Sequence, residues 1–118
     1  MQDFKKLLVW EKAHLVVLKV YKLTKSFPID ERYGLSSQMR RCAVSIPSNM
    51  AEGCGRDTNA QLRHFLEISM GSAAELEYQL LLAYDLKYIP TDSYEKVYSD
   101  ITEIRKMLRS LIQKVSAS

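Results

Sequence analysis

Hydrophobic residues recur along most of the chain with the spacing of an α-helix, and glycine and proline divide this pattern into four segments. The first segment covers about residues 8–26 and ends before Pro28, because proline cannot continue a helix. The second runs from about residue 31 or 33 to residue 52 and ends before a pair of glycines. The third covers about residues 58–88 and the fourth about residues 91–115. The pattern therefore predicts four helices.

Capping signals and short connections organise these segments into one fold. Thr58 is predicted to cap the third helix, with Gln61 three residues later completing a capping box. Thr91 or Asp92 is predicted to cap the fourth helix. Connections this short favour antiparallel neighbours. We therefore expect an all-α chain with a single domain over residues 1–118, folded as an up-down-up-down four-helix bundle.

Three of the segments carry one continuous apolar stripe each when residues are placed 100° apart around a helix. These stripes are the predicted core faces. They consist of Leu35, Met39, Cys42, Ile46 and Met50 in the second segment, Leu62, Phe65, Leu66, Ser69, Ala73, Leu76, Leu80 and Tyr84 in the third, and Val97, Ile101, Ile104, Leu108, Leu111 and Val115 in the fourth.

The first and third segments carry more apolar surface than a single bundle core requires. In the first segment the apolar residues cover well over half of the helix circumference, from Val9 to Leu23. In the third, Ile68, Tyr78, Leu81 and Leu82 extend the apolar surface beyond the core stripe. A helix that is apolar nearly all round must be buried nearly all round. The excess predicts self-association into a homo-oligomer, and scattered surface leucines are the simpler alternative.

Pro47 interrupts the second segment without shifting the phase of its stripe. Proline lacks the backbone N–H of a helix and frees the carbonyl of Ala43, so we expect a kinked second helix rather than a break. Ser45 and Asn49 can satisfy the freed backbone groups, and small residues here and at 71–74 favour close helix packing.

Composition excludes several classes of protein. Hydrophobic residues make up 47% of the chain and charged residues 26%, which is typical of a globular protein and not of a disordered one. No apolar run is long enough for a signal peptide or a membrane span, so we expect a cytoplasmic protein without a membrane partner. Two cysteines are too few for a disulfide scaffold.

Candidate catalytic and metal-binding patterns are weak. The spacing of Glu11 and His14 fits a carboxylate-bridged dimetal centre, but no second such pair and no acidic residue on the second core stripe complete it. Cys42 lies on a core stripe, and Cys54 is predicted to lie in a loop and to be exposed. The chain contains no nucleophile elbow, P-loop or dinucleotide-binding motif. The sequence therefore predicts a protein without a metal, a cofactor or an enzymatic activity.

Basic residues carry the only suggestive polar pattern. The chain has 17 Lys and Arg against 14 Asp and Glu, a net charge of +3. In a ring of identical subunits, modest basic clusters are multiplied into a surface that binds phosphate backbones. Solvation of a helix face and stabilisation of the helix dipole are the alternative roles of such residues. The predicted nucleic-acid-binding residues are Lys12, Lys19 and Lys22 of the first helix and Arg105, Lys106 and Arg109 of the fourth.

A second polar group lies on the second helix, where Arg41, Ser45, Ser48 and Glu52 form one row. This row favours packing between helices over phosphate binding. Further arginines, Arg40, Arg41, Arg56 and Arg63, are expected around the junction of the second and third helices. The predicted residues of helix packing or of an oligomer interface are Arg40, Arg41, Ser45, Pro47, Asn49, Glu52, Leu81 and Leu82.

Several separate motifs resemble the four-helix-bundle protein family encoded in intervening sequences of bacterial 23S rRNA genes, the S23-like family. They are VWEKAH at 9–14, YGLSSQMRR at 33–41, SIPSNMAEG at 45–53 and GSAAELE at 71–77. The resemblance covers nearly the whole chain. It implies a four-helix bundle that assembles as a ring-like homopentamer, and it carries over no catalytic residues.

A related branch of that family is the accessory protein of diversity-generating retroelements, which is thought to bind nucleic acid and a reverse transcriptase. The resemblance thus supports two functional hypotheses. The first is a homo-oligomer, a pentamer in the family, that binds RNA or DNA without reading its sequence. The second is a scaffold or adaptor for another protein, such as a reverse transcriptase or a ribosome-associated factor.

Overall fold

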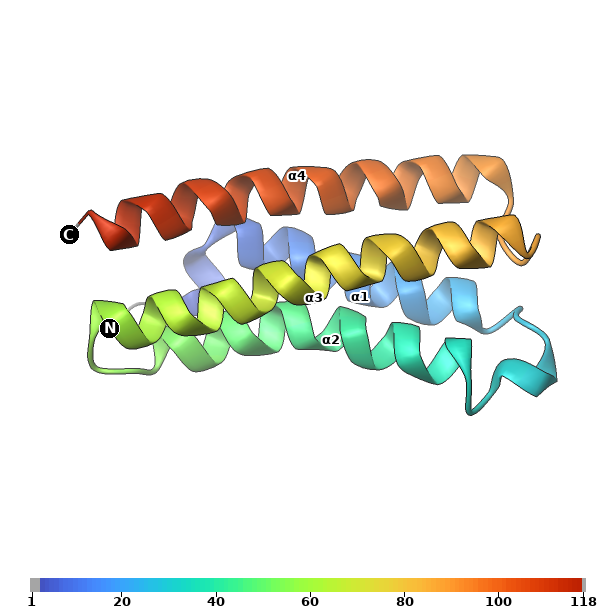
Figure 1. Cartoon of the computed structure of the whole chain (residues 1–118), viewed down its shortest axis with the longest axis horizontal. Coiled ribbons are helices and arrows are strands. Elements are labelled where there is room, and N and C mark those ends of the chain that lie inside the picture. Colours follow the sequence, from blue (N-terminus) through green and yellow to red (C-terminus); the bar gives the residue numbers. More distant parts are fainter. Residues whose placement is uncertain (1–2, 118) are drawn as a thin grey trace.

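The computed structural model describes residues 3–117, and all regular elements in this range are helical. Its four long helices are α1 (Leu8–Thr24), α2 (Leu35–Cys54), α3 (Asn59–Asp85) and α4 (Thr91–Ser116), with two single-turn 3-10 helices, η1 (Phe4–Lys6) and η2 (Ile29–Glu31). Figure 1 shows the long helices side by side with alternating direction. Each packs on its neighbours in sequence, and α1 also packs on α4, which closes the bundle. The predicted all-α four-helix bundle is confirmed.

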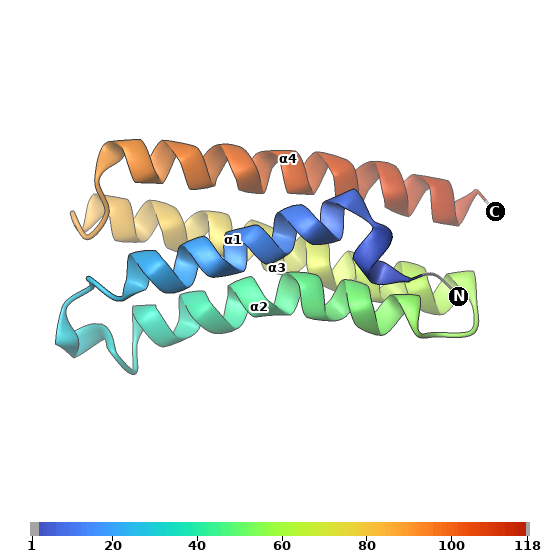
Figure 2. The same ribbon diagram turned by 180° about the vertical axis from the view of Figure 1, so that it is seen from behind.

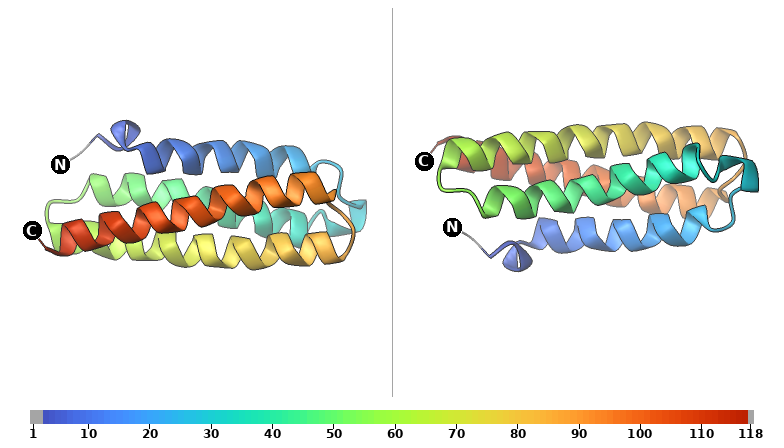
Figure 3. Two further views of the ribbon diagram at one scale, coloured as in Figure 1. Left: turned by 90° about the horizontal axis from the view of Figure 1, so that it is seen from above. Right: turned by 90° about the horizontal axis from the view of Figure 1, so that it is seen from below.

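The bundle has two distinct ends. The α1–α2 and α3–α4 connections lie at one end, and the α2–α3 turn and the C-terminal end of α4 lie at the other (Figures 2 and 3). The molecule measures 45 × 24 × 20 Å. Helix α2 has 20 residues and is about 30 Å long, so its two ends are separated by most of the length of the bundle.

The helix boundaries agree with the predicted ones except at two N-termini. The capping box is confirmed, since the Thr58 hydroxyl accepts from the Gln61 amide at 3.1 Å. Helix α4 has Pro90 at its N-cap and no side-chain cap, so the predicted cap at Thr91 or Asp92 is wrong. Helix α2 begins at Leu35, later than predicted, because η2 interposes a turn and the Glu31 carboxylate accepts from the Leu35 amide at 3.1 Å.

The core consists mainly of the three predicted stripes together with one face of α1. All five stripe residues of α2 are buried. Five stripe residues near the ends of α3 and α4 are only half-buried: Leu62, Phe65, Tyr84, Leu111 and Val115. The core face of α1 consists of Val9, Ala13, Val16, Val17 and Val20.

Helix α2 runs without interruption past Pro47, which is itself buried. A break at this proline is thus excluded, and the kink stays a prediction. The α2–α3 contact is close: a Cβ atom added at Gly53 would lie 3.0 Å from the side chains of both Leu62 and Phe65. The Ser69 hydroxyl donates to the Ile46 carbonyl across the same contact at 2.8 Å. Gly53 and Ser69 thus allow α2 and α3 to pack closely.

The single chain leaves the predicted apolar excess uncovered on two helices. On α1, Leu15 and Leu18 are exposed. On α3, Ile68, Tyr78 and Leu81 are exposed, whereas the predicted interface residue Leu82 is half-buried. A Cβ atom added at Gly71 on this outer side of α3 would meet nothing within 4 Å, so no contact within the chain explains that glycine. Over residues 3–117, none of the helices is both long and apolar enough to span a membrane.

Candidate nucleic-acid interface

Three of the six predicted nucleic-acid-binding residues are engaged in ion pairs between helices. Lys12 Nζ lies 3.2 Å from Glu103 Oε1, and Lys19 Nζ lies 2.6 Å from Asp100 Oδ2. Both pairs join α1 to α4. The lysines of the first helix therefore face a neighbouring helix, and acidic residues of that helix neutralise two of them.

Arg105 forms the third ion pair, with its Nη1 atom 3.1 Å from Glu77 Oε1 of α3. The remaining predicted residues, Lys22, Lys106 and Arg109, are exposed, and none of them is ion-paired with another residue of the range 3–117. Lys22 lies towards the α3–α4 turn, beside Ser93 and Lys96, whereas Arg109 lies in the opposite half of α4. The six residues do not form one continuous patch.

Within the predicted packing row of α2, Ser45 is the residue that contacts a neighbouring helix. The Ser45 and Ser72 hydroxyls lie 2.8 Å apart and connect α2 to α3. Asn49 donates through Nδ2 to the Ser45 carbonyl at 2.8 Å and to the Ser45 hydroxyl at 3.0 Å. Glu52 pairs with Arg56 near the end of the same helix, at 3.0 Å.

Arg40 connects α2 to the C-terminal turn of α1. Its Nε donates to the Thr24 hydroxyl at 2.7 Å, and its Nη2 donates to the Tyr21 carbonyl at 3.3 Å. The guanidinium carbon also lies 4.7 Å from the centre of the Tyr21 ring. Arg40 is thus held in one position by neighbours on α1. The expectation that Arg40 and Arg41 lie near the α2–α3 junction is wrong, since that junction, with Arg56 and Arg63, is at the other end of α2.

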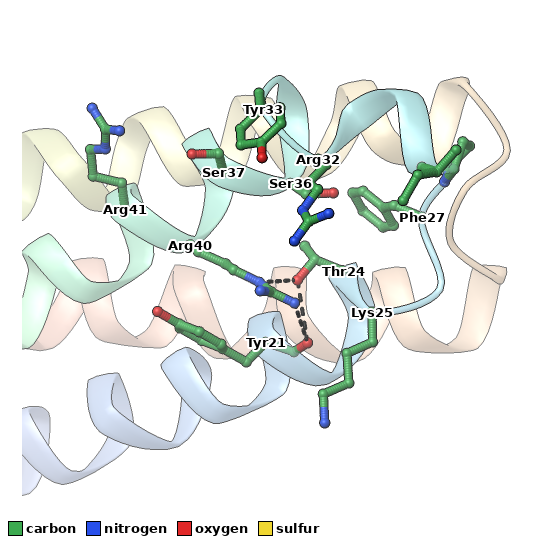
Figure 4. A pocket seen from close by; sticks show the side chains of 12 residues that line it. Tyr21, Thr24, Lys25, Phe27, Arg32, Tyr33, Ser36, Ser37, Arg40 and Arg41 are labelled. Atoms are coloured by element: carbon green, nitrogen blue, oxygen red, sulfur yellow. Dashed lines mark hydrogen bonds between the residues drawn. The ribbon is translucent and has the colours of Figure 1, made fainter.

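These contacts of Arg40 form one side of a pocket of about 630 Å³ between the end of α1, the η2 segment and the start of α2 (Figure 4). Four cationic residues line it: Lys25, Arg32, Arg40 and Arg41. No acidic residue is among its lining residues. Figure 4 shows the guanidinium groups of Arg32 and Arg40 near its middle, whereas Lys25 and Arg41 lie at its edge with their charged ends directed outward. We call this the basic pocket.

The N-terminus of α2 adds hydrogen-bond donors to the basic pocket. The amides of Ser36 and Ser37, which line the pocket, have no acceptor among the described residues, as is usual for the first turn of a helix. Ser36 is only 9% exposed, and its hydroxyl also makes no hydrogen bond within the described chain. The helix dipole adds a partial positive charge at this point. The pocket therefore combines four cations with unpaired donors, an arrangement suited to an anion.

Glu31 is an acidic side chain at the start of α2 that must be weighed against this charge. One of its oxygens accepts from the Leu35 amide, and the other accepts from the Tyr88 hydroxyl at 2.9 Å. This second bond is the main reason that the pKa of Tyr88 is raised, because it favours the protonated phenol. Glu31 fixes the start of α2 next to the pocket and does not line it.

Neither cysteine has the environment of a nucleophile. Cys42 is buried and its thiol donates to the Ser72 carbonyl at 3.1 Å. Burial, and secondarily the charge of Glu75, raises its pKa to about 12. Cys54 is the last residue of α2 and is buried, so the predicted exposed loop position is wrong. Burial also raises the pKa of its thiol. A thiol that stays protonated at neutral pH is a poor nucleophile.

The residues from 3 to 117 contain no group of three or more His, Cys, Asp and Glu side chains placed to hold a metal ion. His14 instead stacks on the Trp10 ring, with ring centres 5.3 Å apart and planes within 5°.

Sequence reasoning did not predict the basic pocket, because its residues come from three elements that only folding brings together. The available signal was the series Lys25, Arg32, Arg40 and Arg41 on both sides of Pro28. Residues on either side of a short turn between antiparallel helices must lie at the same end of the bundle. That rule would have grouped these four cations.

Comparison with known proteins identifies similar chains. The family model described as 23S rRNA-intervening sequence protein matches residues 5–110. The structure is similar to the crystal structure of a protein with unknown function from the S23 ribosomal protein family of Bacteroides thetaiotaomicron VPI-5482, with a TM-score of 0.83 and 30% sequence identity. This similarity covers 90% of the present chain and 96% of the other. No curated protein matches the chain.

Proposed function

The chain belongs to the 23S rRNA-intervening sequence protein family. On this basis we propose that it is a non-enzymatic, homopentameric helical bundle that binds RNA or DNA without reading base sequence. The family provides the fold and has no known catalytic activity. The proposed binding uses the phosphate backbone, which is the same for every sequence.

The observation that carries this proposal is the basic pocket. Four cationic side chains line one concave surface that has no acidic lining residue. Cations gathered in this way repel one another unless an anion neutralises them. Nucleic acid is a partner that supplies anions at regular spacing, and binding releases its condensed counterions.

Self-association would multiply this charge. The apolar residues that the single chain leaves exposed on α3, among them Ile68, Tyr78 and Leu81, are suited to a subunit interface. In a ring, five copies of the basic pocket would be held at fixed distances from one another. Weak contacts at each copy would then add up through multivalency.

We would test binding by fluorescence anisotropy of a labelled structured RNA and a labelled duplex DNA over a salt series, with the oligomer mass measured by light scattering on the same samples. The affinity is expected to fall linearly with salt on logarithmic axes, with a slope of about −0.9 per phosphate for duplex DNA. Absence of binding at low salt by an intact oligomer would contradict the proposal.

Two double variants localise the contact. Arg32→Gln with Arg41→Gln removes two pocket charges, and Arg56→Gln with Arg63→Gln removes two arginines that each pair with a glutamate four residues away. The pocket variant is expected to reduce the salt slope by about two phosphates, and the control variant by much less. Equal losses in the two variants would show that only net charge matters.

A scaffold for another protein is the alternative, and the ion pairs of Lys12, Lys19 and Arg105 favour it because they reduce the charge available for nucleic acid. In that case the polar residues of α2 serve packing. Arg40, Asn49 and Glu52 already have partners within the chain, which leaves Arg41 as the residue available to a neighbouring subunit. Arg41→Ala would then change the oligomer mass without affecting nucleic-acid binding.

A further inference from the structure

The basic pocket differs from an ordinary charged helix face because it is concave and has directed donors. Its volume of about 630 Å³ lies within the range of small-molecule sites, roughly 300–1,000 Å³. The pocket is therefore large enough for a phosphate group together with the nucleoside attached to it, whereas a surface that follows a backbone needs no such depth.

Ser36 adds a hydroxyl donor to the pocket wall. The residue is 9% exposed and lines the pocket, and its hydroxyl has no partner among the described residues. Figure 4 shows it next to Arg32 on the pocket wall. A serine hydroxyl without a partner in the chain is free to donate a hydrogen bond to a ligand. An oxyanion in the pocket would accept from this hydroxyl and from the free amides of Ser36 and Ser37.

We propose that the basic pocket binds the terminal phosphate monoester of a nucleic-acid strand, which rests on the proposed nucleic-acid binding and specifies its ligand. A monoester carries a charge of about −1.5 to −2 at neutral pH, whereas each internal diester carries about −1. The larger charge suits a pocket lined by four cations at a helix N-terminus. A strand end also fits a pocket with a single opening, because the rest of the nucleic-acid strand can leave through that opening.

Tyr33 is placed to contact the nucleoside that follows the phosphate. It lines the pocket, its side chain is 88% exposed, and the Arg32 guanidinium lies 5.6 Å from the centre of its ring. An exposed aromatic ring of this kind stacks on any of the bases. The terminal base therefore adds affinity without adding sequence preference.

The test uses single-stranded RNA dodecamers of one sequence, labelled internally, that carry a phosphate at the 5′ end, at the 3′ end or at neither end. Anisotropy titrations of the intact protein are expected to give at least about tenfold tighter binding of a terminally phosphorylated dodecamer than of the unphosphorylated one. If all three bind equally, the end-recognition proposal is wrong and general backbone binding survives. If none binds at low salt, the proposed function is wrong as well.

Variants show whether the preference arises in the basic pocket. Ser36→Ala and Arg32→Gln are expected to reduce the ratio of the two affinities by about tenfold each, because each removes a hydrogen bond to a charged group. Ser48→Ala, an exposed serine on the same helix, and Arg63→Gln, an exposed arginine of α3, are the matched controls. Both controls are expected to leave the ratio unchanged. A preference that survives in Ser36→Ala and Arg32→Gln proteins of normal helicity and mass would overturn the assignment.

Competition with AMP distinguishes a strand end from a free nucleotide, since both carry a phosphate monoester. If the strand end is the ligand, displacement of the phosphorylated dodecamer needs AMP at more than about a hundred times the dodecamer Kd, because the strand adds contacts to other phosphates. Displacement by AMP at concentrations near that Kd would identify the free nucleotide as the ligand and overturn the strand-end proposal.

Discussion

Lys19 is predicted from the sequence to bind nucleic acid, but its ion pair with Asp100 indicates that it stabilises the fold instead. The two charged atoms lie 2.6 Å apart and connect α1 to α4. A double-mutant cycle with Lys19→Met and Asp100→Asn isolates their coupling, because each change removes the charge and keeps most of the side-chain volume.

The expected coupling follows from the exposure of the pair. The side chains of Lys19 and Asp100 are 43% and 34% exposed, so water screens much of their attraction. Partly exposed pairs of good geometry contribute about 0.5–1 kcal/mol. The neighbouring pair of Lys12 and Glu103 is longer, at 3.2 Å, and Glu103 is 55% exposed. Its coupling is expected to be the smaller of the two.

Urea denaturation at low salt measures both cycles, and repetition in 1 M NaCl provides the control, since the screening length there is about 3 Å. Salt is expected to reduce both couplings. The same Lys19→Met protein is titrated with the labelled RNA, where its affinity should stay close to that of the parent protein. A coupling near zero, together with a loss of affinity as large as that of the Arg32→Gln, Arg41→Gln double variant, would instead assign Lys19 to the binding surface.

Three further predictions concern stability and thiol chemistry. Gly53→Ala is expected to lower the free energy of unfolding by about 1–3 kcal/mol, because its Cβ atom would lie 3.0 Å from side chains of α3. A Cβ atom at Gly71 has no neighbour within 4 Å, so Gly71→Ala should raise the stability of the helix by about 1 kcal/mol. If the urea midpoints of the Gly53→Ala and Gly71→Ala proteins move in the same direction, this contrast is wrong. Ser69→Ala is expected to cost about 1 kcal/mol through its lost bond to α2, while the exposed Ser110→Ala should leave the urea midpoint unchanged. The pKa of Cys42 is raised from 9.0 to about 12, because the folded protein favours the protonated thiol. The stability that this thiol contributes is therefore complete below pH 9 and is lost as the pH rises through 12. Thiol-reactive dyes at pH 8 should label Cys42 only after unfolding, and rapid labelling of both cysteines in the native protein would show that they are accessible.

The helices and the core could be predicted from the sequence because both depend on local periodicity. Met39, Ile46 and Met50 recur at helical spacing, and each is fully buried. The cap at Thr58 is local as well, since donor and acceptor are three residues apart. The predicted cap of α4 was wrong because Pro90 takes the N-cap position and leaves Thr91 inside the helix.

The predicted binding residues show the limit of this reasoning. Charge on a helix face indicates a polar surface, but it does not indicate which helix lies opposite. Lys12 and Lys19 share the polar face of α1 and therefore suggested a ligand. Their partners, Asp100 and Glu103, are about 80 to 90 residues away in sequence and could be assigned only once α1 was placed beside α4.

The order of the amino acids is enough to identify the helical segments, the apolar face of each, and the excess of apolar surface on α1 and α3. These properties depend on residues within a turn or two of each other. Which charges are neutralised and which remain available depends instead on how the helices pack. Packing of α1 on α4 pairs Lys19 with Asp100, and the α1–α2 connection brings Lys25, Arg32 and Arg40 to the N-terminus of α2. Electrostatic pairing acts between atoms a few ångströms apart, and only the packing of the helices sets those distances.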